Sequence, residues 1–582
     1  SCKPHPKFPI SILQRSLKIT DEPPKTLKMN MRRLYNDNLQ LLNGNMSSNY
    51  FASNSSKQDQ YKKLLFCLVF FHSLLLERRK FDSLGWNIPY SFTQSDFKTC
   101  AQILSLYLST YSEIPWNALR YLIAEVNYGG RITDNNDRKL INVYVNSCFN
   151  EKCIKLTNYA LSELSTIYIP DDNKNSLKSY VEYIDSLPNG ADHPGLFGQH
   201  PNADMSSHTT ETNILLDTLL SFESGQSPKT PQQSDSKSDA GVDDDSDSDH
   251  VQESAQQERS KEDIIYDICE QLLQTIPSEF ELAEIRRKHS DSHSPLIVVM
   301  IQEIERYNLL LSTVRASLIN LQKGMKGQIS ISKELDEIGN SVFNNKVPNL
   351  WKSISYPSLK SLPNWTEDLI KRCDQLSRWS QQGKPKVFWL SGFQFPTGFL
   401  TALLQSMSRR QAVAIDNLVW EFNVINNVND LNGESIQMHP KEGAYICGLY
   451  LEGAGWDFND GCLTQPTPMK LSQQMPVIHF RPVEKSQSKQ HHQAKHGGAN
   501  EKESKDGVSG NSGGNGGNNE NNNNSSNSSS NALYQCPTYL YPVRTGTREK
   551  PSFVCNVNLK SGKHSPAFWT KRGAALLLSL AD

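Results

Sequence analysis

The chain has 582 residues, and its charges nearly cancel, with 60 Lys and Arg against 62 Asp and Glu. This length predicts about three or four domains at roughly 150 residues each. The formal net charge of −2 gives no basic excess, so we expect no nucleic-acid partner. The 11 cysteines include no C-x-x-C pair, and the closest two, Cys148 and Cys153, form C-x₄-C. This pattern indicates free thiols in a reducing compartment, not a disulfide framework or a zinc site.

The most apolar run, LLFCLVFFHSLLL, covers Leu64–Leu76. A membrane-spanning helix needs about 20 apolar residues, and charged residues flank this shorter run on both sides. The run therefore predicts a buried helix and no membrane partner. His72 lies within it, and we interpret it as a core histidine because no second metal ligand follows at helical spacing.

Helical hydrophobic spacing runs through the front of the chain. We expect helices at Tyr61–Arg79, Phe97–Thr110, Trp116–Asn127, Arg138–Phe149, Asp263–Thr275, Pro295–Lys323, Ser332–Phe343, Trp365–Trp379 and Thr397–Ser408. The longest follows Ser294, which can cap it, and begins at Pro295, whose missing N–H costs nothing in the first turn. Its apolar residues recur from Ile297 to Leu321 every three or four positions, which predicts one buried stripe.

The back of the chain favours short strands separated by turn residues. We expect them at Asn417–Ile425, Ala444–Leu451, Met475–Arg481, Cys536–Val543 and Ser552–Asn558. Several short strands of this kind are typical of a β-sandwich or a barrel. Val477 and His479 are expected at a strand edge and not as a catalytic pair.

Two segments of low complexity interrupt this pattern. One runs from about Ser224 to Ser260 and is acidic and rich in serine; the other runs from about Ser486 to Asn531 and is mostly Asn, Ser and Gly near its end. Neither can bury enough apolar surface to offset its ordering entropy, so both are predicted to be disordered surface inserts. The serines of the first could be phosphorylated, although a tolerated spacer is the simpler interpretation.

The segment VFWLSGFQFPTGFL, Val387–Leu400, has the outline of a phosphate-binding loop, with a strand, two glycines and then a helix. A P-loop places Lys and Ser or Thr after its second glycine, where they neutralise phosphates and hold Mg²⁺. Here Phe399 and Leu400 follow Gly398, so no side chain at these positions would balance the phosphate charges. We therefore predict a strand-to-helix corner in the core and no nucleotide site.

Other arrangements for chemistry are equally incomplete. The chain has no H-E-x-x-H motif. Nothing positions His491, His492 and His496, which lie in the second insert. Glu452, Asp457 and Asp460 lie close together in the sequence, but they do not have the regular spacing of oxygen ligands that a Ca²⁺ loop requires. We predict no catalytic, cofactor-binding or metal-binding residue.

Several strings, taken together and in order, resemble the C-terminal part of dynein heavy chains. They cover Phe8–Tyr35, Tyr61–Phe92, Ala118–Ile141, Leu187–Asp204, Glu211–Ser221, Arg315–Gly327, Pro348–Leu362, Val387–Arg410, Ala444–Asp457, Met475–Val483 and Phe568–Leu580. Within this family, GWNIPYSF (Gly85–Phe92) and SYPSLKSL (Ser355–Leu362) are similar to axonemal members more than to the cytoplasmic form. One departure is Gly455, where the family pattern E-G-A-R-W-D has a basic residue.

The resemblance implies an α+β, multi-domain fold. It implies the end of the large subdomain of the sixth AAA+ module (1–42), a helical AAA+ lid (60–155), a helical part of the C-terminal domain (156–385) and a β-rich barrel or sandwich subdomain (386–582). YGGR, Tyr128–Arg131, could be read as a sensor arginine near phosphates. We favour a helix-capping turn instead, with Gly129 and Gly130 at positive φ and Asp134 capping the next helix.

The function that the resemblance implies belongs to the full-length family, an ATP- and Mg-dependent motor of cilia and flagella with a coiled-coil stalk. Such a motor moves toward microtubule minus ends and assembles with intermediate, light intermediate and light chains in the cytoskeleton of the axoneme. This part would pack against other modules of the AAA+ ring and would neither hydrolyse ATP nor bind a cofactor. Two alternatives remain, a free-standing scaffold or regulatory protein derived from a dynein C-terminus and, less favoured, an unrelated enzyme.

Overall fold

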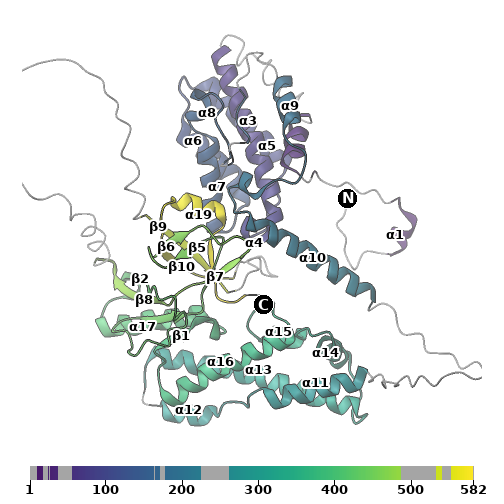
Figure 1. Cartoon of the computed structure of the whole chain (residues 1–582), viewed down its shortest axis with the longest axis vertical. Helices are drawn as coiled ribbons and strands as arrows, with labels where there is room; N and C mark the ends of the chain where they lie inside the picture. Colours follow the sequence, from purple (N-terminus) through teal and green to yellow (C-terminus); the bar gives the residue numbers. More distant parts are fainter. Residues whose placement is uncertain are drawn as a thin grey trace, which may run out of the picture. The chain divides into compact units, whose positions relative to one another are not determined.

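The computed structural model describes residues 10–17, 24, 26–36, 55–162, 164, 166–170, 177–223, 261–290, 292–486, 532–540 and 552–580. The chain divides into two compact units, Ser1–Gln199 and His200–Asp582 (Figure 1). Residues 224–260 and 487–531, which contain the two predicted inserts except Ser486, lie outside the described residues. Helices and sheets are both present, as the α+β prediction requires.

The first unit is mainly helical in its described residues, with one antiparallel bridge between Ala160 and Tyr168. Residues 27–36 form a helix, and the other elements are α1 (Ile10–Arg15), α3 (Ser55–Glu77), η1 (Arg78–Phe81), α4 (Asp82–Gly85), α5 (Gln94–Thr110), α6 (Trp116–Tyr121), η2 (Leu122–Tyr128), η3 (Gly129–Arg131), α7 (Asn135–Cys148), α8 (Lys152–Lys155), α9 (Leu177–Ser186) and η4 (Pro194–Phe197). The predicted helix over 116–127 is right in extent, but it changes to a π-helix at Leu122.

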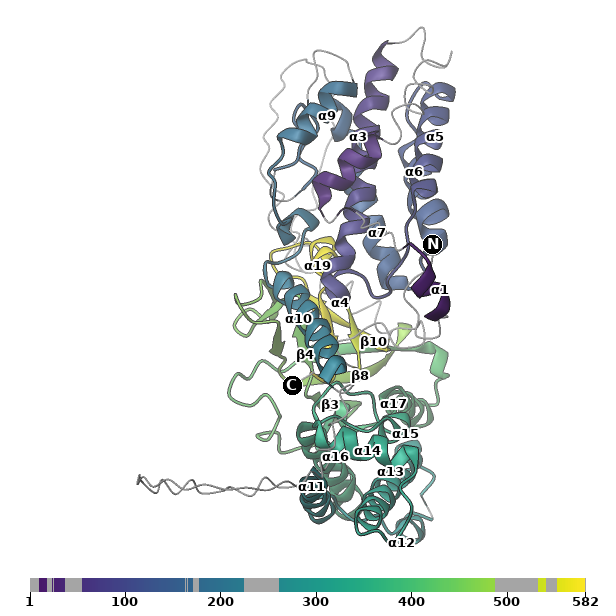
Figure 2. The same ribbon diagram turned by 90° about the vertical axis from the view of Figure 1, so that its right-hand side faces the viewer.

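Helix α3 forms the centre of this unit. Its apolar run, predicted to be a buried helix, has Leu64 to Leu75 almost completely inaccessible to solvent. It contacts α5 and α7, both of which lie on the right of α3 in Figure 2. No helix in the described part of the chain combines the length and apolarity needed to cross a membrane. The ends of the neighbouring helices are set by local capping, as at Thr93, whose N–H donates to the Asp96 carboxylate of α5 at 2.8 Å.

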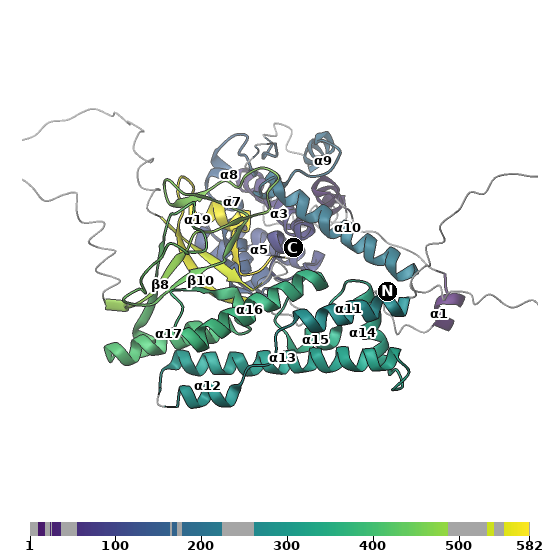
Figure 3. The same ribbon diagram turned by 60° about the horizontal axis from the view of Figure 1, so that its bottom comes forward.

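The second unit begins with a set of helices. They are α10 (Asn202–Glu223), α11 (Lys261–Thr275), α12 (Leu282–Lys288), α13 (Pro295–Met325), α14 (Lys333–Phe343), α15 (Asn349–Ile354), α16 (Leu362–Gln382) and α17 (Pro396–Gln411). Figure 3 shows α13 running alongside α11, α12, α14 and α16. Its predicted stripe is buried from Ile304 to Leu321, whereas Ile297 and Ile301 near its start are half-buried. Ser294 occupies the predicted N-cap position and Pro295 lies in the first turn, but the Ser294 side chain makes no capping hydrogen bond.

The strands of the second unit form three sheets. Their bounds are β1 (Val387–Trp389), β2 (Leu418–Val424), β3 (Ala444–Cys447), β4 (Tyr450–Glu452), β5 (Gly455–Asp457), β6 (Cys462–Thr464), β7 (Ser472–Gln474), β8 (Ile478–Glu484), β9 (Leu533–Tyr539), β10 (Phe553–Lys560) and β11 (Ala575–Leu577). The strand orders are β1-β3-β8-β2, β10-β9-β11-β4-β7 and β5-β6. The pairs β1–β3 and β9–β11 are parallel, and the others are antiparallel. Helix α19 (Pro566–Arg572) precedes β11.

One predicted strand is divided between two sheets. The run Ala444–Leu451 becomes β3 and β4, because Gly448 has a φ of 75° and turns the chain between them. A Cβ on Gly448 would lie 2.3 Å from the Trp389 indole, so the close approach also demands glycine. The prediction that His479 lies at a strand edge is wrong, because β8 is an inner strand between β3 and β2.

Helices and sheets of the second unit share a large hydrophobic core, and Tyr539, Ala575 and Leu577 form a smaller separate cluster. At its centre Phe388, Phe393 and Phe399 gather around Trp379 of α16, with ring centroids 4.7 Å apart for Phe393 and Phe399. Aromatic rings at such distances contribute packing energy beyond their buried area. The segment with a P-loop outline therefore lies at the junction of helices and sheets.

Candidate functional site

The segment that resembles a phosphate-binding loop is a corner between β1 and α17. The chain leaves β1 at Trp389, passes through a short 3-10 turn (η5, Leu390–Gly392) and enters α17 at Pro396. Phe393 and Phe399 are buried, while Phe395 is exposed. The prediction of a strand-to-helix corner in the core is confirmed, and no basic side chain takes the place of the P-loop lysine in this turn.

The corner does hold an anion, and the anion is a side chain of the same unit. The backbone N–H of Gln394 donates to Glu303 Oε2 at 2.6 Å, and that of Phe395 donates to Glu303 Oε1 at 3.1 Å. These N–H groups precede the first turn of α17, where unpaired amides and the helix dipole favour negative charge. Glu303 lies on α13 and its side chain is 0% exposed. The amides that would face a phosphate in a nucleotide site are thus occupied by a carboxylate.

A cation partly balances this buried carboxylate. Arg306, one turn along α13, places Nη1 2.6 Å from Glu303 Oε1. Burial raises the pKa of Glu303, while the hydrogen bond from Gln394 and the charge of Arg306 lower it, and the net direction is upward. The Arg306 guanidinium also lies 5.4 Å from the centre of the Phe395 ring. Glu303 therefore joins α13 to the corner through both charge and backbone hydrogen bonds.

The carbonyl groups of the corner are bound from two helices. Tyr307 of α13 donates its hydroxyl to Gly392 O at 2.9 Å, and Arg372 of α16 donates to Ser391 O. Arg372 is itself fixed by Asp368, with Nε 2.8 Å from Oδ2. The groups involved are buried, so an unpaired carbonyl or amide there would be costly. This network holds the corner in one geometry.

Arg131, which could have been a sensor arginine, is paired within the first unit. Its Nε and Nη2 lie 2.9 and 3.0 Å from the two carboxylate oxygens of Asp96. The Arg131 side chain is 43% exposed and that of Asp96 is 8% exposed. Such a bidentate pair fixes the η3 turn against the start of α5. It also occupies the guanidinium N–H groups that would otherwise bind a phosphate.

The predicted cap at this turn is half right. Asp134 accepts hydrogen bonds from Asn136 N and Asp137 N at 2.9 and 3.0 Å and so caps α7. The predicted positive φ at Gly129 and Gly130 is wrong, because Gly129 has a φ of −66° and Gly130 is not among the residues at positive φ. A Cβ on Gly129 would lie 2.4 Å from Ala124 O, so the glycine is required by the tight π-helical turn.

The histidines and acidic residues considered for chemistry have structural partners. His72 Nδ1 lies 2.8 Å from the Tyr128 hydroxyl, and burial lowers its pKa to about 4, which makes it the neutral core histidine that we predicted. His479 Nε2 lies 2.7 Å from Glu442 O. Asp457 accepts from Asn459 N at 2.9 Å within the β5–β6 turn. His491, His492 and His496 lie outside the described residues.

No metal site emerges among the described residues, since no three His, Cys, Asp or Glu side chains there are grouped to hold an ion. No disulfide bond joins the described cysteines, and Cys153 Sγ contacts Cys148 O at 3.1 Å. At the departure from the family pattern, a Cβ on Gly455 would lie 2.8 Å from Gln465 O. The absence of a side chain at this position thus lets β5 approach its neighbour closely.

Comparisons with known proteins agree with this architecture. The family model for the C-terminal domain of dynein heavy chains matches residues 209–497 and 518–578, and the model for their AAA lid domain matches residues 61–203. The chain belongs to the dynein heavy chain family. The resemblance found in the sequence is thereby confirmed, and the matched domains are the lid and the C-terminal domain.

The named relatives are axonemal and flagellar dynein heavy chains. The chain is 44% identical over 581 residues to the dynein-1-beta heavy chain of the flagellar inner arm I1 complex of Chlamydomonas reinhardtii, and 44% identical over 578 residues to dynein axonemal heavy chain 2 of Homo sapiens. It is 37% identical over 485 residues to dynein axonemal heavy chain 3 of Mus musculus. These alignments cover 100%, 99% and 83% of this dynein chain and 11% of each relative.

Sequence reasoning identified the corner of this dynein chain but missed the residue that occupies it. Glu303 lies 91 positions before Gln394, so no local motif connects them. One signal was available, because Glu303 lies on the apolar stripe of α13 between Met300 and Tyr307. A carboxylate at a buried helical position requires a hydrogen-bonding partner, although the sequence does not say which one.

Proposed function

We propose that this chain is the C-terminal part of an axonemal dynein heavy chain and that the whole protein is an ATP-driven motor moving toward microtubule minus ends in cilia and flagella. The family assignment and the axonemal and flagellar relatives support this proposal. Because the chain spans 11% of these relatives, the motor activity, the microtubule track and the accessory chains belong to the whole protein.

Within that motor, the chain would serve as structural support for the AAA+ ring. The lid unit would complete the sixth module, and the C-terminal domain would pack against other ring modules. The finer boundaries, after residues 42, 155 and 385, and the arrangement of the β-rich part as a barrel or a sandwich remain predictions. Limited proteolysis followed by mass spectrometry would test the boundaries, since cleavage concentrates where few contacts cross.

The observation that carries the structural role is the occupation of the corner by Glu303. The Glu303 carboxylate accepts hydrogen bonds from both N–H groups that a phosphate would need, and Glu303 belongs to the same unit as the corner. A nucleotide would have to displace a buried carboxylate and then face a turn without a lysine. We therefore propose that this part of the motor has no catalytic, cofactor-binding or metal-binding residue and that ATP and Mg²⁺ bind elsewhere in the whole protein.

The test is a titration of the purified chain with a fluorescent ATP analogue and Mg²⁺, read by fluorescence polarisation. We expect no saturable binding, and we expect Arg131→Ala to leave the result unchanged because that arginine is paired with Asp96. Tight, Mg²⁺-dependent binding would overturn the proposed structural role. A chain with Glu303→Gln serves as a second probe of the corner, since it keeps an acceptor but removes the charge.

The motor assignment is tested separately by the size and location of the native protein. An antibody against residues 551–582 would be used on denaturing blots of ciliated and non-ciliated tissue. We expect a band far above 65.7 kDa that is confined to ciliated tissue. A band near 65.7 kDa in both tissues would contradict the axonemal motor and favour a free-standing scaffold.

A further inference from the structure

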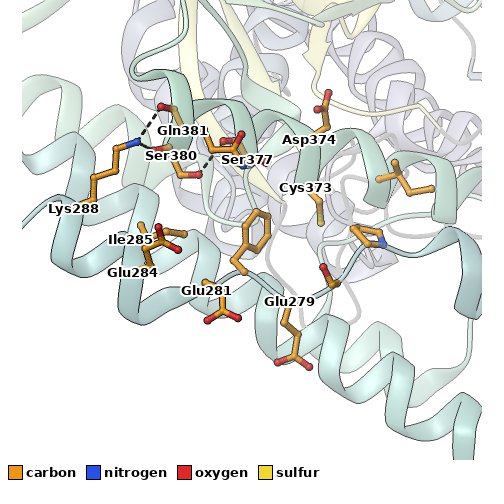
Figure 4. Close-up of a pocket in the computed structure, with 14 residues that line it drawn as sticks. Glu279, Glu281, Glu284, Ile285, Lys288, Cys373, Asp374, Ser377, Ser380 and Gln381 are labelled. Atoms are coloured by element: carbon orange, nitrogen blue, oxygen red, sulfur yellow. Dashed lines mark hydrogen bonds between the residues drawn. The ribbon is translucent and has the colours of Figure 1, made fainter.

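A groove of about 520 Å³ lies between the α11–α12 connection, α12 and α16 in the second unit. Its floor is apolar, with Phe280 and Ile285 on one side and Ile370 and Cys373 of α16 on the other. Figure 4 shows Cys373, Asp374 and Ser377 on α16, opposite the side chains of the α11–α12 connection and α12. The groove shares none of the residues of the β1–α17 corner, although α16 contributes to both.

The wall formed by the α11–α12 connection is fixed from behind. Asn308 of α13 accepts from Phe280 N at 2.8 Å and donates to Phe280 O at 2.9 Å, so one amide side chain satisfies both backbone groups. Arg315 of α13 donates to Ile276 O and, at 3.3 Å, to Pro277 O. A connection held in this way presents a preformed surface. Binding there costs less free energy, because the α11–α12 connection is already ordered.

The rim of the groove is acidic. Glu279, Glu281 and Glu284 line it on the side of the α11–α12 connection, and Asp374 lines it on α16. All four are exposed. Of these, Asp374 is paired with Arg378, one turn along α16. The other three carboxylates have no ion-pair partner within the described ranges of the chain.

Two cations near this rim contact groups other than its carboxylates. Lys288, which also lines the groove, donates to Ser380 O at 2.9 Å and to Gln381 O at 3.0 Å and so binds the last turn of α16, as the dashed lines in Figure 4 show. Arg286 of α12 is paired with Glu305 of α13. The charged side chains that line the groove are four carboxylates and one cation, Lys288, so the rim keeps a net negative charge.

We propose that this groove docks a basic segment of a partner protein, in which Lys or Arg residues flank an apolar side chain. The apolar side chain would cover the floor at Ile285, Ile370 and Cys373, and the cations would lie against the glutamates of the rim. Charge complementarity of this kind selects a basic partner and disfavours an acidic one. The floor contributes through burial of apolar surface, at about 25 cal/mol per Å².

The arrangement fits a polypeptide better than a metal ion. No group of three or more His, Cys, Asp or Glu side chains converges to hold a metal ion in the part of the chain that the structure describes. Here the carboxylates are spread along a rim, and an apolar floor lies between them and α16. A chain with alternating cationic and apolar side chains can satisfy both features at once.

The test uses a fluorescein-labelled peptide of 12 residues in which Lys and Arg alternate with Leu, with anisotropy measured against the purified chain. We expect saturable binding that weakens as salt rises, because the rim charges are exposed and screened. A photoreactive residue in the same peptide, followed by mass spectrometry, is expected to cross-link to residues 277–288 or 370–381. The matched control peptide has Glu in place of every Lys and Arg and is expected not to bind.

Two variants of the chain test the site itself. Glu281→Lys with Glu284→Lys is expected to weaken binding about tenfold or more, since two attractive charges become repulsive. Ser377→Phe is expected to weaken binding without changing the charge, because the new ring would fill the groove. The control Glu270→Lys with Glu334→Lys makes the same charge change at exposed positions outside the groove and should stay within about twofold of the parent chain.

Each alternative outcome would overturn the proposal. Equal binding to both double variants would mean that the peptide senses only net charge. Binding of the acidic peptide, or cross-links elsewhere, would place the interaction on another surface. Concentration-dependent self-association that Ser377→Phe abolishes, measured by sedimentation, would assign the groove to a second copy of the chain. Circular dichroism of each variant checks that a loss of binding is not a loss of folding.

Discussion

Two turns, one in each unit, have similar sequences and the same pattern of backbone hydrogen bonds to a carboxylate. In the first unit the turn is Gly85-Trp86-Asn87-Ile88-Pro89, and in the second it is Gly392-Phe393-Gln394-Phe395-Pro396. In both, a glycine, an aromatic residue, an amide and an apolar residue precede a proline. The N–H groups of the amide and the apolar residue donate to one buried carboxylate, which is Asp137 in the first turn and Glu303 in the second.

The carbonyls of both turns are bound by buried donors, but the charges around the carboxylates differ. Arg78 donates to Gly85 O at 2.8 Å, and Tyr307 donates to Gly392 O at 2.9 Å. Burial, and then the nearby carboxylate of Asp134, raise the pKa of Asp137 to about 7. Glu303 instead has Arg306 beside it, which offsets part of the effect of burial. The carboxylate of the second turn therefore has a cation that partly balances its charge, whereas that of the first turn has another carboxylate nearby.

The largest expected effect is that of Glu303→Ala. It would remove the acceptor of the part-buried Gln394 and Phe395 N–H groups and the partner of Arg306, so we expect a loss of about 3–4 kcal/mol in the stability of the second unit. Hydrogen exchange of peptides from α13 and α17 would measure this loss without averaging over the two units. Glu305→Ala, at an exposed pair on the same helix, is the control and should cost about 1 kcal/mol or less. Equal losses for the two variants would show that Glu303 does not fix the corner.

The next prediction concerns the two glycines that begin these turns. A Cβ on Gly85 would lie 2.1 Å from Arg78 O, which is backbone, whereas a Cβ on Gly392 would lie 2.6 Å from the Gln375 side-chain amide. Backbone yields less than a side chain, so we expect Gly85→Ala to cost about 2–3 kcal/mol and Gly392→Ala about 1 kcal/mol. Hydrogen exchange of α4 and of α17 would compare them. A larger loss at Gly392 would mean that the second turn is the more rigid one.

Much of the helical framework could be predicted from the sequence, and the reasons are local. Helical spacing identified α3, α5, α7 and α13 within a few residues, and Asp134 was recognised as a cap because its partners are two and three residues away. The missing lysine of a P-loop was equally visible. In each case the deciding residues are neighbours in the chain.

What could not be predicted depends on residues distant in sequence. Glu303 reaches Gln394 over 91 positions, and Asp137 reaches Asn87 over 50. The division of the run from 444 to 451 into β3 and β4 depends on Trp389, which lies against Gly448. Gly129 is required because a Cβ would meet the backbone of the π-helix, and not because its φ is positive. A glycine in a sequence is compatible with either requirement, so the sequence alone does not tell them apart.

A smaller effect, and one that depends on pH, is expected for Asp137→Asn. The pKa of Asp137 is raised above its unfolded value, so the stabilisation that it gives is complete below about pH 4 and is lost as pH rises through about 7. The variant lacks this titration but loses one acceptor for the Ile88 N–H. We therefore expect it to be less stable than the parent chain by about 1–2 kcal/mol at pH 5 and by less at pH 8.

Calorimetry at pH 5, 6.5 and 8 would measure this difference for the first unit. Glu77, whose pKa burial raises to about 7, and His72, whose pKa burial lowers to about 4, also titrate there in opposite senses. They are present in both proteins, so they cancel in the comparison. Glu303→Gln is the matched variant in the second unit, and its penalty should change less with pH because of Arg306. A penalty for Asp137→Asn that is constant with pH would contradict the contrast between the two turns.

The smallest expected effect is at Arg131. It allows a comparison between the two features of the sequence that suggested a nucleotide site, which are this arginine and the β1–α17 corner. Arg131→Ala removes an ion pair whose arginine is 43% exposed, so water can solvate the Asp96 carboxylate that remains. We expect a loss of less than about 1 kcal/mol, measured by hydrogen exchange of α5, and a smaller loss still at high salt. Arg131→Lys should recover part of it, since one charge contact is kept while the bidentate geometry is lost. A loss as large as that of Glu303→Ala would show that exposure does not distinguish the two sites and that the η3 turn depends on Arg131 as fully as the corner depends on its buried carboxylate.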